Sequence, residues 1–353
     1  MRFKSKYRQQ LLIQYCVGWT LAFVFLSIVR GVGTEELGSL QFSFMASMIL
    51  SGTLGPIIGL ISGYAQIITE ERIYRRIPIQ KLLAIRFTYA LIFQILLILI
   101  AYMSYQLYFG TDIGIILFAT DHGSFAIYFY VLVVDLFFAV LRQVNLMLGE
   151  KNLGKLITGK FYTPRVEERI FMFLDLQSST KWAEQLGHIK YSMLIQDCFN
   201  DLGVVVEYEA EIYQYVGDEV ILTWPLESGL RHQNCIRAFF AFKKQLTSRE
   251  TYYKGKYGIV PFFKAGLNAG PITVTEVGRY KKEIAYHGDT INTAARIQGK
   301  CNELGEELLI SGFLRQVLDW SEFFIKEMGM LPLKGKSETV DIFSVYKNET
   351  VDE

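Results

Sequence analysis

The segment Ile170-Phe-Met-Phe-Leu-Asp175-Leu-Gln-Ser-Ser-Thr180 decides the fold of the second half of the chain. Its first part, Ile170–Leu176, is an apolar run with one acidic residue, and its length predicts a strand buried in the middle of a sheet. The serines and threonine that follow favour the start of a helix. Asp175 is therefore expected where the strand ends and the helix begins.

Strands and helices alternate after this segment. We expect strands at 211–216 and 220–224 joined by a tight turn at Gly217–Asp218, a second hairpin of 262–268 and 272–277 around Gly270, and a short strand at 307–310. Helices are expected up to Gln185, over 188–202 and 229–247, and from Asp289. This order predicts an α+β domain over residues 167–347, with helices covering one face of a largely antiparallel sheet.

The first half of the chain is much more apolar than the second. Overall, 51% of the 353 residues are hydrophobic, and the mean hydropathy is +0.24. Four apolar stretches, 11–29, 43–68, 83–105 and 124–147, reach the length of about 20 residues that a membrane-spanning helix needs. We expect an all-α bundle of four spans in a lipid bilayer over residues 1–147. The glycine- and lysine-containing residues 148–166 are then a signalling linker.

The basic residues predict the orientation of these spans. They gather before the first span, between the second and third, and after the fourth: Arg2, Lys4, Lys6, Arg8, Arg72, Arg75, Arg76, Lys81, Lys151, Lys155 and Lys160. The two opposite loops hold only Arg30 among four acidic residues. The positive-inside rule places both termini and the second half in the cytoplasm, on the cell (inner) membrane.

Asp135 lies near the middle of the fourth span, where a charge is unfavourable by a few kcal/mol or more. It is interpreted as a neutral acid hydrogen-bonded inside the bundle, and the alternative is a sensing site. The net charge of +1 gives no reason to expect nucleic-acid binding. The four cysteines show no CxxC spacing, so they indicate neither a zinc site nor a disulfide framework.

Two aspartates are candidates for metal binding. Asp175 follows a buried strand and Asp218 lies in the neighbouring hairpin turn, so both carboxylates can share a pair of Mg²⁺ ions. The backbone amides of residues 177–180, at a helix N-terminus, would suit phosphate. Taken singly, each aspartate is better explained as a helix cap or a turn residue than as a metal ligand, and only the pair suggests a metal site.

Five ordered motifs resemble those of the class III nucleotidyl cyclases. They are Phe173-Leu174-Asp175-Leu176 with Ser179-Thr180, Val216-Gly217-Asp218, Ala265–Gly270, Tyr286–Arg296 and Leu333–Lys336. The resemblance covers nearly all of the second half and implies a ferredoxin-like α+β catalytic domain. It also implies formation of a 3′,5′-cyclic nucleotide and pyrophosphate from a nucleoside triphosphate.

The resemblance also assigns roles to the matching positions. Asp175, Leu176 and Asp218 would hold two Mg²⁺ or Mn²⁺ ions, one of which lowers the pKa of the ribose 3′-hydroxyl. Asn292 would orient the ribose, and Arg296, four residues later on the same helix face, would stabilise charge on the α-phosphate. The remaining substrate contacts would come from Gln177, Ser178, Ser179, Thr180 and Lys334, the last binding the terminal phosphates.

In this family the active site forms between two subunits. One subunit supplies the metal-binding aspartates, and the other supplies Asn292 and Arg296. The resemblance therefore implies a homodimer, and a single chain would hold two incomplete sites.

The residues that read the base depart from the family pattern. Adenylyl cyclases usually have a lysine at the position of Gln214 and an aspartate or threonine at the position of Ala285, whereas guanylyl cyclases have glutamate and cysteine. The amide of Gln214 can still read a base, but Ala285 offers only its backbone, so a neighbour such as Tyr286 would have to help. ATP is the favoured substrate, a pyrimidine triphosphate is the first alternative, and GTP is the second alternative.

Two alternatives belong to other classes of protein. One is a catalytically inactive receptor in which the cyclase fold only dimerises, although the full set of metal and substrate residues argues against it. The other is a transporter or channel, which four spans with a single clear mid-membrane charge and no repeat do not favour.

Overall fold

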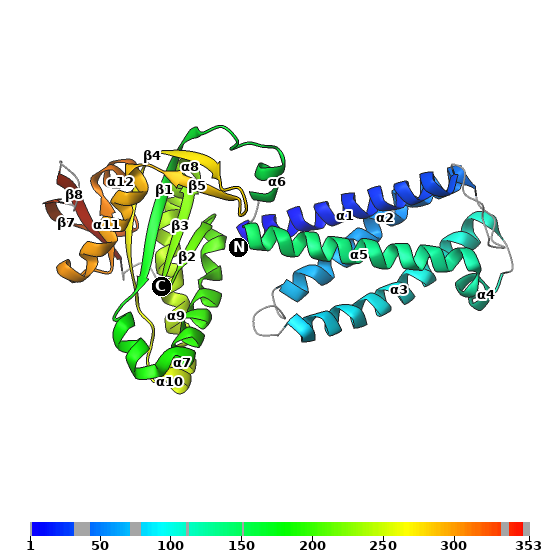
Figure 1. Cartoon of the computed structure of the whole chain (residues 1–353), viewed down its shortest axis with the longest axis horizontal. Coiled ribbons are helices and arrows are strands. Elements are labelled where there is room, and N and C mark those ends of the chain that lie inside the picture. The colour runs from blue at the N-terminus through cyan, green and yellow to red at the C-terminus, as the bar shows by residue number, and fades with distance from the viewer. Residues whose placement is uncertain are drawn as a thin grey trace. The chain divides into compact units, whose positions relative to one another are not determined.

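The computed structural model describes residues 2–31, 43–70, 79–110, 113–149, 152–332 and 339–348 (Figure 1). The chain divides into a helical unit, Arg2–Val144, and a C-terminal unit, Asn145–Glu353.

Among its described residues, the helical unit has four long helices and one short one. They are α1 (Arg2–Gly31), α2 (Phe44–Ile68), α3 (Ile79–Phe109), α4 (Ile115–Thr120) and α5 (His122–Leu148). By length and composition, four stretches of the described residues could cross a membrane: Tyr7–Gly31, Phe44–Ile68, Phe87–Tyr108 and His122–Leu148. The four expected apolar spans are confirmed as helices. The short α4, which precedes the last of them, was not expected.

Polar groups inside the helical unit connect α1 and α5 with Glu70, which lies just after the end of α2. Arg142 is only 6% exposed and donates from Nε to Oε1 of Glu70 at 2.6 Å and from Nη2 to Oε2 at 2.8 Å. The hydroxyl of Tyr7 also donates to Oε2 of Glu70, at 2.9 Å. A bidentate arginine–carboxylate pair of this kind satisfies both charges away from water.

Asp135 lines a small polar cavity inside the same unit. The cavity has a volume of about 30 Å³ and is lined by Tyr15, Ser62, Ala65, Gln66, Thr69, Tyr89 and Asp135. Ser62 Oγ donates to Asp135 Oδ1 at 3.5 Å. Asp135 is therefore hydrogen-bonded within the bundle, as its interpretation as a hydrogen-bonded acid requires, while its neutral state and a sensing or packing role stay predictions.

One mixed sheet forms the centre of the C-terminal unit. Its strands are β1 (Arg165–Leu176), β2 (Glu211–Val216), β3 (Glu219–Pro225), β4 (Phe263–Val277), β5 (Glu283–His287), β6 (Leu308–Ser311), β7 (Phe323–Pro332) and β8 (Thr339–Lys347). Their order is β2-β3-β1-β4-β6-β8-β7, and β5 pairs with β4. Among the strands that the structure describes, only the β4–β6 pair is parallel. The expected largely antiparallel α+β fold is confirmed.

Helices cover both faces of this sheet. They are α7 (Ser179–Asp201), α8 (Leu226–Leu230), α9 (Asn234–Ser248), α10 (Glu250–Tyr257), α11 (Asp289–Leu304) and α12 (Gly312–Val317), with 3-10 turns at Leu202–Tyr208 and Arg231–Gln233. The short α6 (Asn152–Ile157) precedes β1 and has no buried residue. The expectation of a single covered face is wrong. A run that is apolar at every position, as Ile170–Leu174 of β1 is, is typical of a strand buried on both sides.

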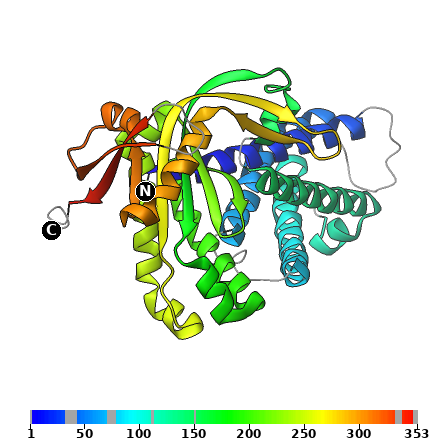
Figure 2. The ribbon, with the colours of Figure 1, turned by 60° about the vertical axis from the view of Figure 1, so that its left-hand side comes forward.

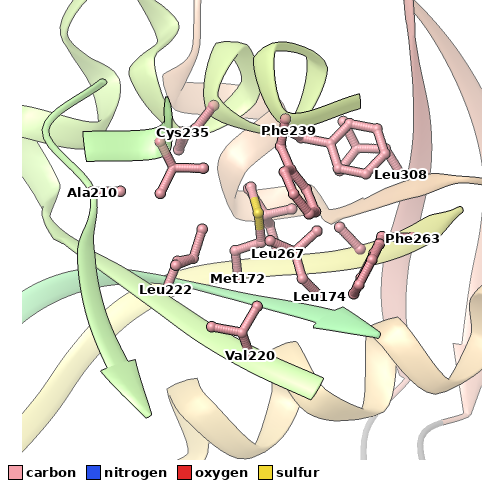
Figure 3. Packing of buried hydrophobic residues seen from close by; sticks show 14 of the residues in the cluster. Met172, Leu174, Ala210, Val220, Leu222, Cys235, Phe239, Phe263, Leu267 and Leu308 are labelled. Atoms are coloured by element: carbon pink, nitrogen blue, oxygen red, sulfur yellow. The ribbon is translucent and has the colours of Figure 1, made fainter. Parts of the chain in front are cut away.

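The side chains of β1 alternate between two hydrophobic clusters. Met172 and Leu174 pack with Val220, Leu222 and Phe239 on the face covered by α7 and α9 (Figure 3). Phe171 and Phe173 point to the opposite face, where they pack with α11 residues such as Ala294. The sheet therefore separates α11 from α7 and α9.

The expected hairpin around Gly270 does not form. Residues 263–277 are one strand, which lies beside β1 in Figures 1 and 2, and the pairing runs without a break from Arg165–Val274 to Leu176–Phe263. Gly270 adopts a φ of +154° that favours glycine, and it continues the strand rather than turning it. The turn prediction failed because β1 satisfies the hydrogen bonds of β4 on both sides of the glycine.

The two helices expected before and after Gly187 form one element, α7. Gly187 interrupts it with a φ of +70° and a ψ of 164°. The break that the sequence indicated is therefore present, although the chain resumes the helix at once.

The segment before β1 is anchored in the sheet by Phe161. This ring is 2% exposed and packs with Phe171, Ile272 and Val274 on the face that α11 covers. The backbone N–H of Glu276 donates to the Phe161 carbonyl at 2.8 Å. The C-terminal unit therefore includes residues on the N-terminal side of its first strand.

Replacing Phe161 with alanine tests this anchor. Loss of a fully buried phenylalanine removes about 3–5 kcal/mol from the free energy of unfolding of the C-terminal unit. The measurement is hydrogen exchange of β1 and β4 amides in the full-length protein. The neighbouring Tyr162 is 80% exposed, so Tyr162→Ala is the control and should change that free energy by no more than about 0.5 kcal/mol. Equal effects of both substitutions would contradict the anchor.

Candidate active site

Pairing of β1 with β3 brings the two candidate metal-binding aspartates together. Asp175, at the end of β1, pairs with Glu219, the first residue of β3. Asp218 precedes Glu219 in the turn from β2, and Gly217 takes the positive φ of +63° that this tight turn requires. The sheet register, rather than either motif alone, therefore creates the acidic site.

The carboxylates in this site destabilise one another as anions. Burial and then the charge of Asp218 raise the pKa of Asp175 to about 6. Burial and then the charges of Asp175 and Asp218 raise the pKa of Glu219 to about 7. A divalent cation between the aspartates would offset this repulsion.

The donors present fit Mg²⁺ or Mn²⁺ bound together with a substrate. The aspartates offer hard carboxylate oxygens, and Leu176, whose side chain is 1% exposed, can contribute only main-chain groups. Within the part of the chain that the structure describes, no group of three or more His, Cys, Asp or Glu side chains is placed to hold a metal ion. Two carboxylates completed by water and phosphate oxygens are the usual arrangement for Mg²⁺.

The proposed phosphate-binding segment lies at the start of α7. Ser178 precedes this helix with a φ of +59°, and its carbonyl accepts from the Trp182 amide at 3.1 Å. The amide of Gln177 donates to the Phe262 carbonyl at 2.9 Å. Because that amide is engaged in the structure, a phosphate would have to use the amides of Ser178, Ser179 and Thr180.

Helix α11 carries Asn292 and Arg296. Asn292 is exposed, whereas Arg296 is 29% exposed and its Nη1 lies 3.9 Å from Oδ1 of Asp289. This Nη1 is buried and has no hydrogen-bond partner among the described residues. A buried guanidinium N–H without a hydrogen-bond partner is suited to donate to an anionic oxygen, as the phosphate role expected for Arg296 requires.

The two expected base-reading residues lie on different hairpins. Gln214 is exposed on β2, which pairs with β3, and Ala285 is half-buried on β5, where it pairs with Thr275 of β4. Tyr286, which was considered as an additional reader, packs its ring 5.0 Å from Cζ of Arg169 and 4.8 Å from the ring of Tyr213. The side chain of Tyr286 therefore already has a structural role.

Lys334 and the surrounding motif, Leu333–Lys336, lie outside the described residues. The role expected for Lys334 stays a prediction.

Two residues of the site were not anticipated from the sequence. Glu219 is the third carboxylate, and Gln298 of α11 donates from Nε2 to Oδ2 of Asp175 at 3.4 Å. The position of Glu219 directly after Asp218 was an available signal. Nothing in the local pattern around Gln298 indicates a contact with a residue 123 positions earlier.

This combination of fold and acidic site agrees with the comparisons with known proteins. Residues 161–346 match the model of the adenylate and guanylate cyclase catalytic domain, and the chain belongs to this family. A solved structure of a bacterial light-regulated adenylyl cyclase has a TM-score of 0.55 at 16% identity, and the match covers 64% of this chain and 67% of that one. The likeness confirms the expected cyclase fold.

Two curated relatives come from Rhizobium meliloti (strain 1021). Adenylate cyclase 2 is 33% identical over 205 residues, which are 58% of this chain and 56% of that protein. Adenylate cyclase 1 is 26% identical over 186 residues, which are 51% of this chain and 27% of that protein. The chain thus matches about half of the first relative and a quarter of the second.

Arg296→Ala should lower kcat by about 10²–10³-fold, because one preorganised donor to developing charge is lost. Arg296→Lys should restore little of this, since an ammonium lacks the planar fork of a guanidinium. The measurement is steady-state turnover with a nucleoside triphosphate. Lys300, four residues further along α11, pairs with Glu303 at 2.6 Å and provides the control. A loss of similar size in Lys300→Ala would contradict a specific role of Arg296.

Proposed function

We propose that this protein is a membrane-bound class III cyclase that converts ATP into 3′,5′-cyclic AMP and pyrophosphate. The observation that carries the proposal is the pair of mutually repelling aspartates at the end of β1 and in the β2–β3 turn. They lie within a segment that belongs to the cyclase catalytic-domain family. A charge arrangement that needs a cation suits two-metal phosphoryl chemistry.

The residues of this chain would divide the work of the reaction. Asp175, Asp218 and the main chain of Leu176 would hold two Mg²⁺ or Mn²⁺ ions, which supply Lewis-acid activation of the ribose 3′-hydroxyl. Asn292 would orient the ribose for in-line attack on the α-phosphate. Arg296 would stabilise the charge that develops there, and Lys334 would bind the terminal phosphates.

The active unit is a homodimer in this proposal. Each active site would take its aspartates from one chain and Asn292 and Arg296 from the other. Nη1 of Arg296 supports this division, because it finds no hydrogen-bond partner among the described residues of its own chain. The helical unit would anchor the dimer in the cell (inner) membrane, with both termini and the catalytic domain in the cytoplasm.

ATP is the proposed substrate, and the relatives named adenylate cyclases support this choice. A specific observation keeps a second product open. The partners expected to read adenine, Gln214 and Ala285, include only one side chain able to hydrogen-bond a base, and a site with fewer buried polar readers discriminates less between bases. Cyclic CMP or UMP is therefore the second candidate, ahead of cyclic GMP.

A competition assay tests the proposed reaction. Purified full-length protein receives ATP, GTP, CTP and UTP in equal amounts with Mg²⁺ or Mn²⁺, and products are identified by mass. Cyclic AMP should dominate, and Asp175→Ala or Asp218→Ala should abolish it. A cyclic pyrimidine would overturn the substrate but not the mechanism. Absence of cyclic product from folded, dimeric protein would favour an inactive receptor.

Mixing two inactive variants tests the shared site. Asp175→Ala and Asn292→Ala chains should each be inactive as homodimers, because each removes a component that both active sites need. Heterodimers retain one complete site, so the mixture should recover up to about a quarter of wild-type activity if chains pair at random and contribute equally. Heterodimer formation is verified by pull-down with two affinity tags. Verified heterodimers without activity would contradict the shared-site model.

A further inference from the structure

Helix α11 approaches the sheet unusually closely at Gly266 of β4. A Cβ atom at this glycine would lie 2.5 Å from Cα of Gln298, so no other residue fits there without moving the helix. Gly266 pairs with Phe173 of β1, two residues before Asp175. The absence of a side chain at Gly266 thus brings the backbone of α11 close to the acidic end of β1.

This close approach brings the side-chain amide of Gln298 within hydrogen-bonding distance of Asp175, the first of the two candidate metal-binding aspartates. Gln298 is 9% exposed, and its Nε2 donates to Asp175 Oδ2 at 3.4 Å. The hydrogen bond favours the ionised carboxylate and directs one of its oxygens toward α11. The other oxygen of Asp175 is thereby oriented away from the helix.

Gln298 and Arg296 leave the same helix in nearly opposite directions. Residues two positions apart in an α-helix are separated by about 200° around its axis. Gln298 faces the sheet of its own chain with Thr290, Thr293, Ala294, Ile297 and Cys301, the buried residues of α11. Arg296 and the exposed Asn292 lie off this buried face. The same helix therefore carries Gln298 on the face toward the sheet of its own chain, and Asn292 and Arg296 away from that face.

We infer that Gln298 is a positioning residue that orients Asp175 of its own chain for metal binding. The inference rests on the proposed shared site. In the dimer, α11 would supply Asn292 and Arg296 to one active site while Gln298 holds Asp175 of the other. Each α11 would thus link the two sites, so that metal and substrate at one influence the geometry of the second.

The contact could instead serve only to seat α11, and the chain offers a matched control. Cys301 lies three residues further along the buried face of α11, is 0% exposed, and donates from Sγ to the Ala265 carbonyl at 3.3 Å. Cys301→Ala loosens the same helix against the same strand without removing the donor to Asp175. Gln298→Ala removes that donor.

The inference is tested in heterodimers with a single complete active site, in which Gln298→Ala is introduced into one chain or the other. One chain carries Asn292→Ala and supplies the aspartates, and the other carries Asp175→Ala and supplies Asn292 and Arg296. Gln298→Ala in the first chain should raise the free Mg²⁺ needed for half-maximal activity by about 10-fold. The same substitution in the second chain should leave that concentration within about twofold. Equal effects in both placements, or none in either, would overturn the inference.

A binding measurement without turnover complements this test. Mn²⁺ binding to the full-length homodimer is followed from the electron paramagnetic resonance signal of free Mn²⁺, with 3′-deoxy-ATP present so that no cyclisation occurs. Gln298→Ala should weaken binding by about 10-fold, and Cys301→Ala should not. If the heterodimers are inactive but Gln298→Ala still weakens Mn²⁺ binding, the shared site fails while the positioning role stands. Wild-type affinity in Gln298→Ala would overturn the positioning role.

Discussion

The C-terminal unit depends on one constraint: β1 is apolar on both faces and must be covered on both. Its pairing with β3 and its uninterrupted pairing with β4 satisfy its backbone hydrogen bonds. Helices on opposite sides of the sheet bury its apolar side chains. The apolar run ends at an aspartate, so a strand buried on both faces carries a carboxylate at its end. The position of Asp175 is therefore set by the pairing and burial of the strand that carries it.

The acidic site shows how electrostatic cost and function are connected. Asp175 and Glu219 are paired neighbours with Asp218 next to them, and burial together with mutual repulsion raises the pKa of the first two. A fold selected for stability alone would not gather carboxylates in this way. The repulsion, the hydrogen bond from Gln298 and the Nη1 of Arg296, which has no hydrogen-bond partner among the described residues, all suit binding of a metal–triphosphate complex.

Some features could be predicted because they are local. The apolar spans, the strand before Asp175, the glycine turn before Asp218 and the start of α11 each depend on a few consecutive residues. The predictions that failed depended on distant partners. Gly270 indicated a turn by its own preference, but the register with β1 kept the strand continuous. The prediction that helices cover a single face was wrong because the position of α11 depends on its contact with Gly266, and the two segments lie far apart in the chain.

The sequence by itself determined the class of protein, since its ordered motifs and apolar spans need only residue type and spacing to be identified. It also located Asp175, Asp218, Asn292 and Arg296 within their elements. Tertiary structure alone decided which of these groups meet, because strand register and helix seating are set by packing over the whole sheet. It added Glu219 and Gln298 to the site, and it separated the faces of α11 so that Gln298 reaches its own chain's carboxylate.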